Sequence, residues 1–128
     1  MPIYLSFVEP RIYLAEWKGM VTLHEVVHRT PNINDLVTER GDTEYVLLID
    51  MSQVTHFPLD IHNLRSSADD DSRAMCYFIV QPPPVARVII RILNKIARTS
   101  FLLVNSVDEG LAQARRYLQE HRDAFANP

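Results

Sequence analysis

The stretch Tyr45–Val54 constrains the fold more than any other part of the chain, because it opens with the uninterrupted apolar run Tyr-Val-Leu-Leu-Ile. A strand with one face in water alternates apolar and polar residues, whereas a strand covered on both faces is apolar throughout. We therefore predict a central strand here, with helices packed on both of its faces. Ala74–Val80 is a second run of the same kind and predicts a second buried strand.

Two further strand-like runs begin the chain, and a short one lies near its end. Ile3–Val8 and Arg11–Trp17 flank the break at Glu9-Pro10 and are predicted to form a hairpin. Phe101–Val104 is predicted to be the last strand.

Helical patterns separate the later strands. A capping box at Thr22 and Glu25 predicts a helix that continues to Val37, is kinked or divided at Pro31 and stops at Gly41.

The next helix is predicted to open at Pro58, because proline fits the first helical position, and to end at the acidic turn Asp69–Asp71. Its narrow apolar stripe consists of Ile61, Leu64 and Ala68. A second capping box, Ser106 to Glu109, opens the last helix.

The segment Pro84–Arg98 predicts an amphipathic helix. Six apolar residues recur at helical spacing and are expected to cover the sheet: Val85, Val88, Ile89, Ile92, Leu93 and Ile96. Four basic residues share another face: Arg87, Arg91, Lys95 and Arg98. This basic face is either an ordinary solvated surface or a docking surface for an acidic partner or anionic lipid. Ile90 lies on a flank between the two faces and is expected to be exposed beside Arg87 and Arg91, which suits contact with a partner.

The predicted order of elements is β-β-α-β-α-β-α-β-α, an α/β fold in a single domain over residues 1–128. Strands and helices alternate after the hairpin, so crossover connections are expected to give a largely parallel central sheet of about five strands, with helices packed against it.

Charge and composition disfavour several classes of protein. The chain has 13 basic and 16 acidic residues, so it lacks the overall basic character expected of a nucleic-acid-binding protein. Its one cysteine, Cys76, lies in an apolar run and is expected to be a buried thiol without a disulfide. No apolar stretch approaches the roughly 20 residues that span a bilayer, and the N-terminus lacks the pattern of a signal peptide. We therefore expect a cytoplasmic protein with no stable membrane insertion and no nucleic-acid partner.

His24-Glu25-Val26-Val27-His28 matches the H-E-x-x-H pattern, in which two histidines one turn apart bind zinc and the glutamate activates water. Glu25 is already assigned to the capping box, and both histidines are expected on the solvent side of the helix. No third histidine follows at a suitable spacing. A zinc-dependent hydrolase is therefore the least favoured of three functions, and no cofactor or metal site is expected.

The order of elements and three stretches of sequence resemble the STAS domain, the SpoIIAA-like fold of the anti-sigma-factor antagonists. Trp17–Thr22 resembles the family's passage from a strand through glycine to a helix. Val46–Val54 is similar to its central strand, an apolar run ending Asp-Leu-Ser-x-Val, and Phe101–Arg115 resembles its last strand and final helix. The resemblance implies a non-catalytic module of bacterial origin that binds a partner or small ligand at the start of the helix after the central strand.

The loop after the central strand departs from that family. In the antagonists it carries Asp-Ser-Ser-Gly with a phosphorylated serine, whereas Thr55–Ile61 reads Thr-His-Phe-Pro-Leu-Asp-Ile. Asp60 falls at or near the phospho-acceptor position, where it either caps its helix or marks a recognition surface with a fixed negative charge. The chain thus resembles a divergent member of the family.

We predict a binding or regulatory module that acts through protein contacts around this helix N-terminus. The residues expected to bind the partner or ligand are His56, Phe57, Asp60, Leu64, Arg87, Ile90 and Arg91. The alternative is a binder of a small hydrophobic or lipid-like ligand, with Phe57, Leu59 and Tyr77 lining the pocket. No catalytic residue is expected, and a free edge at Ile3–Val8 leaves a homodimer through strand pairing open.

Overall fold

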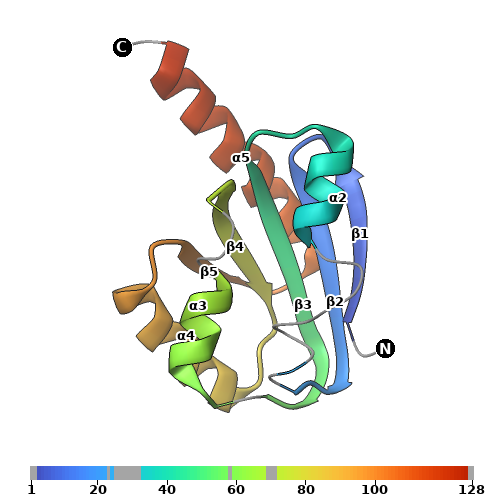
Figure 1. The fold of residues 1–128 in the computed structure, drawn as a ribbon, viewed down its shortest axis with the longest axis vertical. Helices are drawn as coiled ribbons and strands as arrows, with labels where there is room; N and C mark the ends of the chain where they lie inside the picture. The colour runs from blue at the N-terminus through green and yellow to red at the C-terminus, as the bar shows by residue number, and fades with distance from the viewer. Residues whose placement is uncertain (1–2, 23, 25–32, 58, 69–71, 127–128) are drawn as a thin grey trace.

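The computed structural model describes residues 3–22, 24, 33–57, 59–68 and 72–126. Its strands are β1 (Ile3–Glu9), β2 (Ile12–Met20), β3 (Tyr45–His56), β4 (Ala74–Val80) and β5 (Ser100–Val104). Its helices are α2 (Ile33–Arg40), α3 (Ile61–Ala68), α4 (Pro84–Ile96) and α5 (Val107–Ala126). This order of elements is the predicted one, and Figure 1 shows the strands side by side in one sheet.

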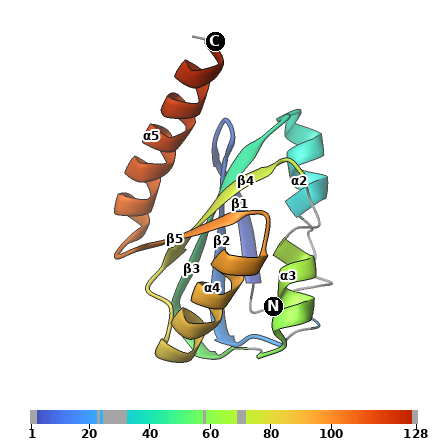
Figure 2. The ribbon, with the colours of Figure 1, turned by 90° about the vertical axis from the view of Figure 1, so that its left-hand side faces the viewer.

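The five strands lie in the order β1-β2-β3-β4-β5, which is also their order along the chain. β1 and β2 are antiparallel, and the three remaining pairings are parallel. The predicted hairpin and largely parallel sheet are therefore confirmed. In Figure 2, α5 lies on one side of the sheet, and α2, α3 and α4 lie on the other.

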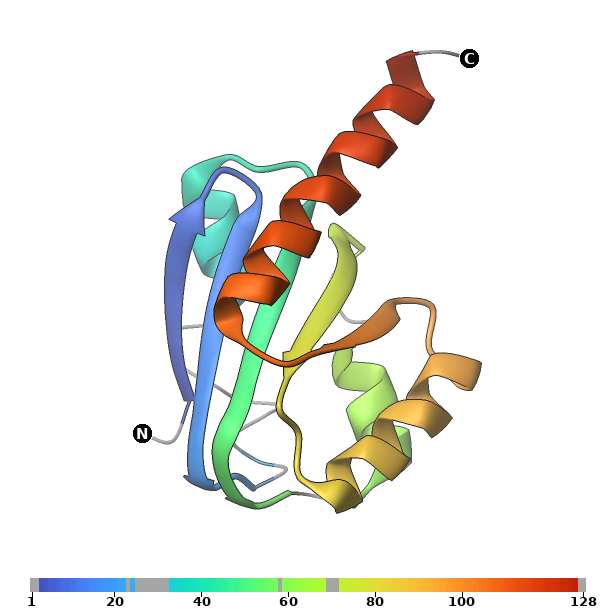
Figure 3. The same cartoon turned by 180° about the vertical axis from the view of Figure 1, so that it is seen from behind.

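The long apolar run of β3 serves two separate cores. Tyr45, Leu47 and Ile49 belong to the larger core on the side of α2, α3 and α4. Val46 and Leu48 point to the opposite side and pack with residues of α5, which crosses that face of the sheet in Figure 3. Because both faces are covered, every position from Tyr45 to Ile49 must be apolar, as the sequence indicates.

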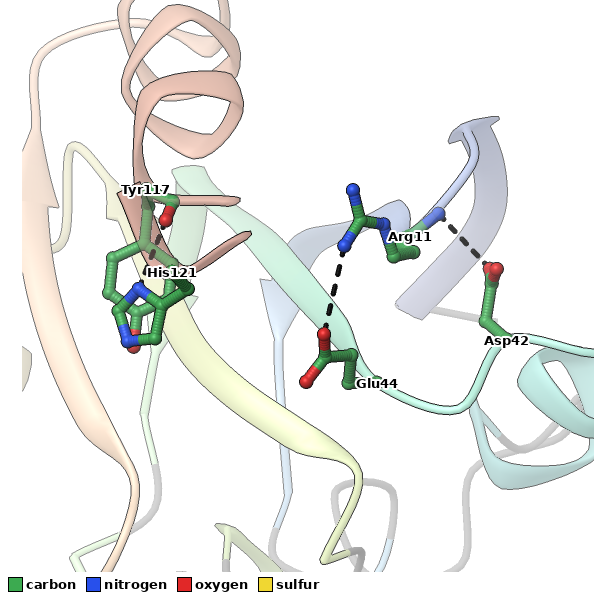
Figure 4. Close-up of polar contacts among 5 residues, drawn as sticks. All are labelled: Arg11, Asp42, Glu44, Tyr117 and His121. Atoms are coloured by element: carbon green, nitrogen blue, oxygen red, sulfur yellow. Dashed lines mark hydrogen bonds and ion pairs between the residues drawn. The ribbon is translucent and has the colours of Figure 1, made fainter. Parts of the chain in front are cut away.

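Polar contacts hold the elements together at the amino edge of the parallel strands. Asp42 accepts hydrogen bonds from the Arg11 backbone N–H at 3.1 Å and from the Tyr13 hydroxyl at 2.5 Å. The Arg11 guanidinium lies 3.7 Å from the Glu44 carboxylate (Figure 4). These bonds fix the β1–β2 turn, where Arg11 has a φ of 69°.

The final helix is fixed at its start and along its length. Ser106 caps α5 by accepting from the Glu109 N–H at 3.0 Å, as the capping box predicts, but the Glu109 carboxylate accepts from the N–H of Asn105, one residue earlier than expected. The Arg115 guanidinium donates to Glu9 of β1 at 2.6 Å. Further along α5, His121 Nδ1 lies 3.0 Å from the Tyr117 carbonyl oxygen (Figure 4).

Some sequence predictions fall partly or wholly outside the described residues. They include the Thr22–Glu25 capping box, the break at Pro31, the proposed helix start at Pro58 and the acidic turn Asp69–Asp71. As described, α3 begins at Ile61. The expected stop of α2 at Gly41 is confirmed, since Gly41 follows its last residue with a φ of 77°. No helix in the described ranges is both long and apolar enough to cross a bilayer.

Candidate functional site

At the carboxyl edge of the sheet, β2 and β3 extend beyond the end of β4 as a two-stranded ribbon. The pairing of β3 with β4 ends at Asp50 opposite Val80, whereas its pairing with β2 continues to His56 opposite Met20. The Val21 N–H then donates to the His56 carbonyl at 3.1 Å. This extension carries the loop before α3 to the edge of the molecule (Figure 1).

Phe57 is fixed against this extension by an aromatic contact. Its ring stacks on the indole of Trp17, with centroids 6.0 Å apart and planes inclined by 21°. Trp17 is buried, and Phe57 is half-buried against the larger core. Phe57 therefore anchors the loop as well as forming part of its surface.

Asp60 is the N-cap of α3. Its Oδ1 accepts from the Asn63 backbone N–H at 3.2 Å and its Oδ2 from the Asn63 side-chain amide at 2.8 Å. Its carbonyl accepts from the Leu64 N–H at 3.0 Å. These bonds to Asn63, the backbone bond first, lower the pKa of the Asp60 carboxyl from its ordinary value. Asp60 thus remains charged at neutral pH while its side chain stays exposed.

Two apolar side chains are exposed at the same edge. Met20, at the end of β2, is 59% exposed, and Leu59, next to the cap, is 62% exposed. His56, also exposed, has its Nδ1 3.2 Å from the Thr55 hydroxyl oxygen. A negative charge, an imidazole and two apolar side chains form a surface suited to contact with another macromolecule.

Two residues assigned to the site are buried instead. Leu64 is 5% exposed and Ile90 is 3% exposed, and both belong to the larger core. Leu64 is on the inner side of α3, one turn after the cap, so it supports the site from beneath. The prediction that Ile90 is exposed beside Arg87 and Arg91 is wrong, because α4 turns that flank toward the sheet.

The rotation of α4 corrects the predicted division of its apolar residues. The core side consists of Ala86, Ile89, Ile90 and Leu93. Four residues expected to cover the sheet are exposed instead: Val85, Val88, Ile92 and Ile96. In this rotation the Asn94 side-chain amide donates to the Phe101 carbonyl at 2.9 Å and accepts from the Phe101 N–H at 2.7 Å. These bonds satisfy backbone groups on β5, and one apolar face of α4 lies outside the core.

The basic residues of α4 that were assigned to the site are exposed. Arg87 and Arg91 both lie on the surface, and Arg87 Nε donates to the Pro82 carbonyl at 3.3 Å. α3 and α4 lie side by side on the same face of the sheet (Figure 2), and both begin at its carboxyl edge. The start of α3 and the outer side of α4 are therefore neighbouring surfaces.

The remaining functional motifs receive no support from the geometry. Of the H-E-x-x-H sequence, only His24 is described, with an exposed side chain; Glu25 and His28 lie outside the described residues. The described part of the chain contains no group of three residues able to hold a metal. Tyr77, assigned to a hydrophobic ligand pocket, is buried and stacks on Phe101 at 5.1 Å, so it belongs to the core.

Sequence reasoning did not identify Trp17 and Met20 as parts of this edge, nor the exposed row on α4. A signal existed for Met20, because it lies in the stretch Trp17–Thr22 that resembles a passage from a strand through glycine to a helix; the structure pairs it with His56 at the end of β3. Nothing in the spacing could have paired Trp17 with Phe57, since they meet only through the register of β2 and β3.

No model of a known protein family matches this chain, and no curated protein matches its sequence. Solved structures do match its fold. An uncharacterised protein of the DUF3478 family from Shewanella loihica PV-4, described as having a SpoIIAA-like fold, gives a TM-score of 0.61 at 15% identity, covering 88% of this chain and 91% of that one.

Two forms of SpoIIAA match as well. The unphosphorylated anti-sigma factor antagonist SpoIIAA gives a TM-score of 0.58 at 11% identity, covering 89% of this chain and 97% of that one. The phosphorylated form of SpoIIAA, described as a Bacillus cell fate determinant, gives 0.57 at 11% identity, covering 87% and 97%. The chain therefore has the SpoIIAA-like fold that the sequence predicts.

Proposed function

We propose that this SpoIIAA-like chain is a non-catalytic regulatory module of the bacterial cytoplasm, and that it acts by binding another protein at the carboxyl edge of its sheet. The contact surface would include Met20, His56, Leu59 and Asp60, with α4 beside it. The observation that carries the proposal is the pair of exposed apolar residues at this edge, Met20 at the end of β2 and Leu59 next to the Asp60 cap of α3.

The fold supports a regulatory role. One of the matching proteins is named an anti-sigma factor antagonist, and it matches in an unphosphorylated and a phosphorylated form. The described residues of the present site include no cluster of metal ligands. The Thr55 hydroxyl and the His56 imidazole are in contact there, but they belong to adjacent, exposed residues rather than to an enclosed site. Binding is therefore favoured over catalysis as the function of this surface.

The chemistry of Asp60 favours a contact that is not switched by phosphorylation at that position. A carboxylate cannot accept a phosphate from a serine kinase to give a phosphoserine. An aspartate is already ionised at neutral pH, and the lowered pKa of Asp60 favours the charged form further. A partner would therefore meet the same charge at all times. Control of the interaction would then come from the amount of either protein or from another surface.

Site-specific photo-crosslinking tests the proposal. A photoreactive amino acid is placed at Leu59, and the matched control carries it at Ala112, which is exposed on α5. We expect one partner protein to be crosslinked from Leu59 and not from Ala112. Its yield should fall strongly in a Met20→Ser, Asp60→Ser variant that keeps the photoreactive group and retains its unfolding transition. Equal crosslinking from both positions, or no partner from Leu59 in cells that produce the chain naturally, would refute the proposal.

A further inference from the structure

We infer that the outer face of α4 binds an acidic amphipathic helix of the partner protein. This inference rests on the proposed function and deepens it, because it specifies the chemistry of the partner. The docking face is defined by two rows of side chains on α4, an apolar row of Val85, Val88, Ile92 and Ile96 and a basic row of Arg87, Arg91 and Lys95.

The apolar row lies outside the core. Its four side chains are 37–54% exposed, although they are Val and Ile, which are normally among the most buried residue types. Val88, Ile92 and Ile96 are spaced four residues apart and form a continuous ridge, and Val85 extends it by one turn. The row runs over the twelve residues from Val85 to Ile96, a rise of roughly 16 Å at 1.5 Å per residue, so a partner helix of about three turns would cover it.

The basic row lies alongside this ridge at the same four-residue spacing. Each basic residue immediately precedes a member of the ridge in sequence: Arg87 before Val88, Arg91 before Ile92 and Lys95 before Ile96. The segment Pro84–Arg98 contains no acidic residue, whereas the rest of the chain has nine basic residues against 16 acidic ones. The positive charge is thus concentrated beside one apolar ridge in an otherwise acidic chain, which is complementary to an acidic partner.

A helix suits this face better than a flat or flexible partner. Ridges at four-residue spacing interdigitate with the grooves of a second helix. The β-branched side chains of the ridge have few rotamers, so they lose little entropy on packing. The ridge is also held in place, because Asn94 ties α4 to the backbone of Phe101 through two hydrogen bonds. A rigid surface of this kind favours the docking of an amphipathic helix.

A second copy of the chain does not meet these requirements. Pairing α4 with α4 would bring two basic rows into one interface, and like charges oppose association. The other large apolar residues exposed in the described part of the chain lie on strands or in the loop before α3: Tyr4, Val8, Met20, Leu59, Leu102 and Leu103. They provide no acidic helix that could occupy the face.

An anionic membrane also fits less well. Interfacial helices insert Trp, Phe or Leu and keep a wide polar face in the headgroups. The ridge has only Val and Ile, the basic row flanks it on one side, and its other flank is closed by the residues that cover the sheet, Ala86, Ile89 and Leu93. Little of α4 could therefore enter a bilayer without leaving the core.

Binding of synthetic helices to the purified full-length chain tests the inference. The first peptide is a stapled helix of about 18 residues with leucines at i, i+3, i+4 and i+7 and glutamates along one flank. The second has lysines in place of the glutamates. Fluorescence anisotropy measures affinity, and amide shifts in the ¹⁵N-labelled chain identify the contacted helix. We expect the glutamate peptide to bind at least about tenfold more tightly than the lysine peptide, with shifts centred on α4.

Two variants separate the contributions of the rows. Ile92→Ser should lower the affinity for the glutamate peptide by about tenfold or more. The fold should stay intact, because Ile92 is partly exposed. Arg91→Glu combined with Lys95→Glu should reverse the preference, so that the lysine peptide binds the variant more tightly than the glutamate peptide does. This exchange of preference is a gain of binding, and loss of folding could not produce it.

Several results would overturn the inference. They are equal affinity for the two peptides, no reversal in the double variant, concentration-dependent dimerisation abolished by Ile92→Ser, or binding to phosphatidylglycerol vesicles without binding to the glutamate peptide. If the crosslinked partner is still captured through Leu59 while neither peptide binds α4, the inference fails and the proposed function stands. If no partner is captured through Leu59, the proposed function fails, whatever the peptides do.

Discussion

The indole of Trp17 and the phenyl ring of Phe57 stack with their centroids 6.0 Å apart, which joins β2 to the loop that begins α3. The two residues are 40 positions apart in the sequence. Their contact means that the candidate binding surface is positioned by the core of the sheet as well as by its own loop. A change at the core side of the stack would therefore alter recognition.

Phe57→Ala should loosen this loop and lower the free energy of unfolding by about 2 kcal/mol, below the range for a fully buried phenylalanine because Phe57 is half-buried. Trp17 is the only tryptophan in the chain, so its fluorescence reports directly on the stack. We expect the emission of the variant to shift to the red. Leu59→Ala, a change at an exposed neighbour, should leave the emission unchanged, and an equal shift in both variants would contradict the assigned contact.

Asp60→Ala should destabilise α3, because the variant loses the acceptor of the Asn63 N–H, whereas Asp60→Ser keeps an N-cap oxygen and should be close to wild type. The pKa of Asp60 is lower in the folded chain than in the unfolded chain. The stability that its ionised carboxyl contributes is therefore fully present above the unfolded-state pKa and is lost as pH falls through the folded-state pKa. Urea titrations at neutral and acidic pH measure this, and the difference between wild type and Asp60→Ala should shrink at acidic pH.

Tyr13→Phe should lower the free energy of unfolding by about 2 kcal/mol, because the Tyr13 hydroxyl donates to the Asp42 carboxylate. Burial first, and then this bond, raise the pKa of Tyr13 above its ordinary value of 10.0. The corresponding stability is complete below that value and is lost as pH rises through the folded pKa. Wild type should therefore lose stability above about pH 10 more steeply than the variant. Parallel curves in alkaline urea titrations would rule this out.

Ile90→Ala and Ile92→Ala are matched changes two residues apart, on different sides of α4. Ile90 lies in the core, so Ile90→Ala should lower the free energy of unfolding by about 3 kcal/mol. Ile92 lies on the outer face, so Ile92→Ala should lower it by less than about 1 kcal/mol. Urea unfolding of the two variants gives both values. A larger cost at Ile92 would mean that α4 is rotated from the orientation described above, and the docking face would then be lost.

Cys76 should be unreactive toward Ellman's reagent while the chain is folded. Its side chain is fully buried, and burial raises the pKa of the thiol to about 12, so the nucleophilic thiolate is scarce at neutral pH. We expect rapid labelling in denaturant and slow labelling in buffer, at a rate that follows the opening of the sheet. Prompt labelling of the folded protein would show that β4 is accessible.

The strands could be predicted well because burial on both faces leaves a clear mark in the sequence. Tyr45–Ile49 is apolar throughout since it serves two cores, and the observed β4 has the predicted bounds of Ala74–Val80. The α4 helix could not be oriented in the same way. Apolar residues occupy more than half of its circumference, so its pattern allows two rotations. The choice between them depends on how the helix packs against the sheet, where Ala86, Ile89, Ile90 and Leu93 enter the core.

The candidate site was predicted in location and only partly in composition. Asp60 and Phe57 lie at the start of α3 as expected, because the carboxyl end of a parallel strand leads directly into the next helix. Leu64 and Ile90 were both assigned to partner or ligand binding, Leu64 from the apolar stripe of its helix and Ile90 as an exposed residue, and both lie in the core. Spacing shows which residues share a side of a helix, but tertiary packing determines which side faces inward.

The strands lie across the sheet in the order in which the ribosome makes them. Each new strand can therefore add to an edge already in place, without waiting for a later segment to be inserted between earlier ones. Such a chain is suited to folding during its synthesis, because each parallel pair joins two consecutive strands that are separated by a single crossover connection. Its last step would then be the docking of α5, which covers the second core only after all five strands are present.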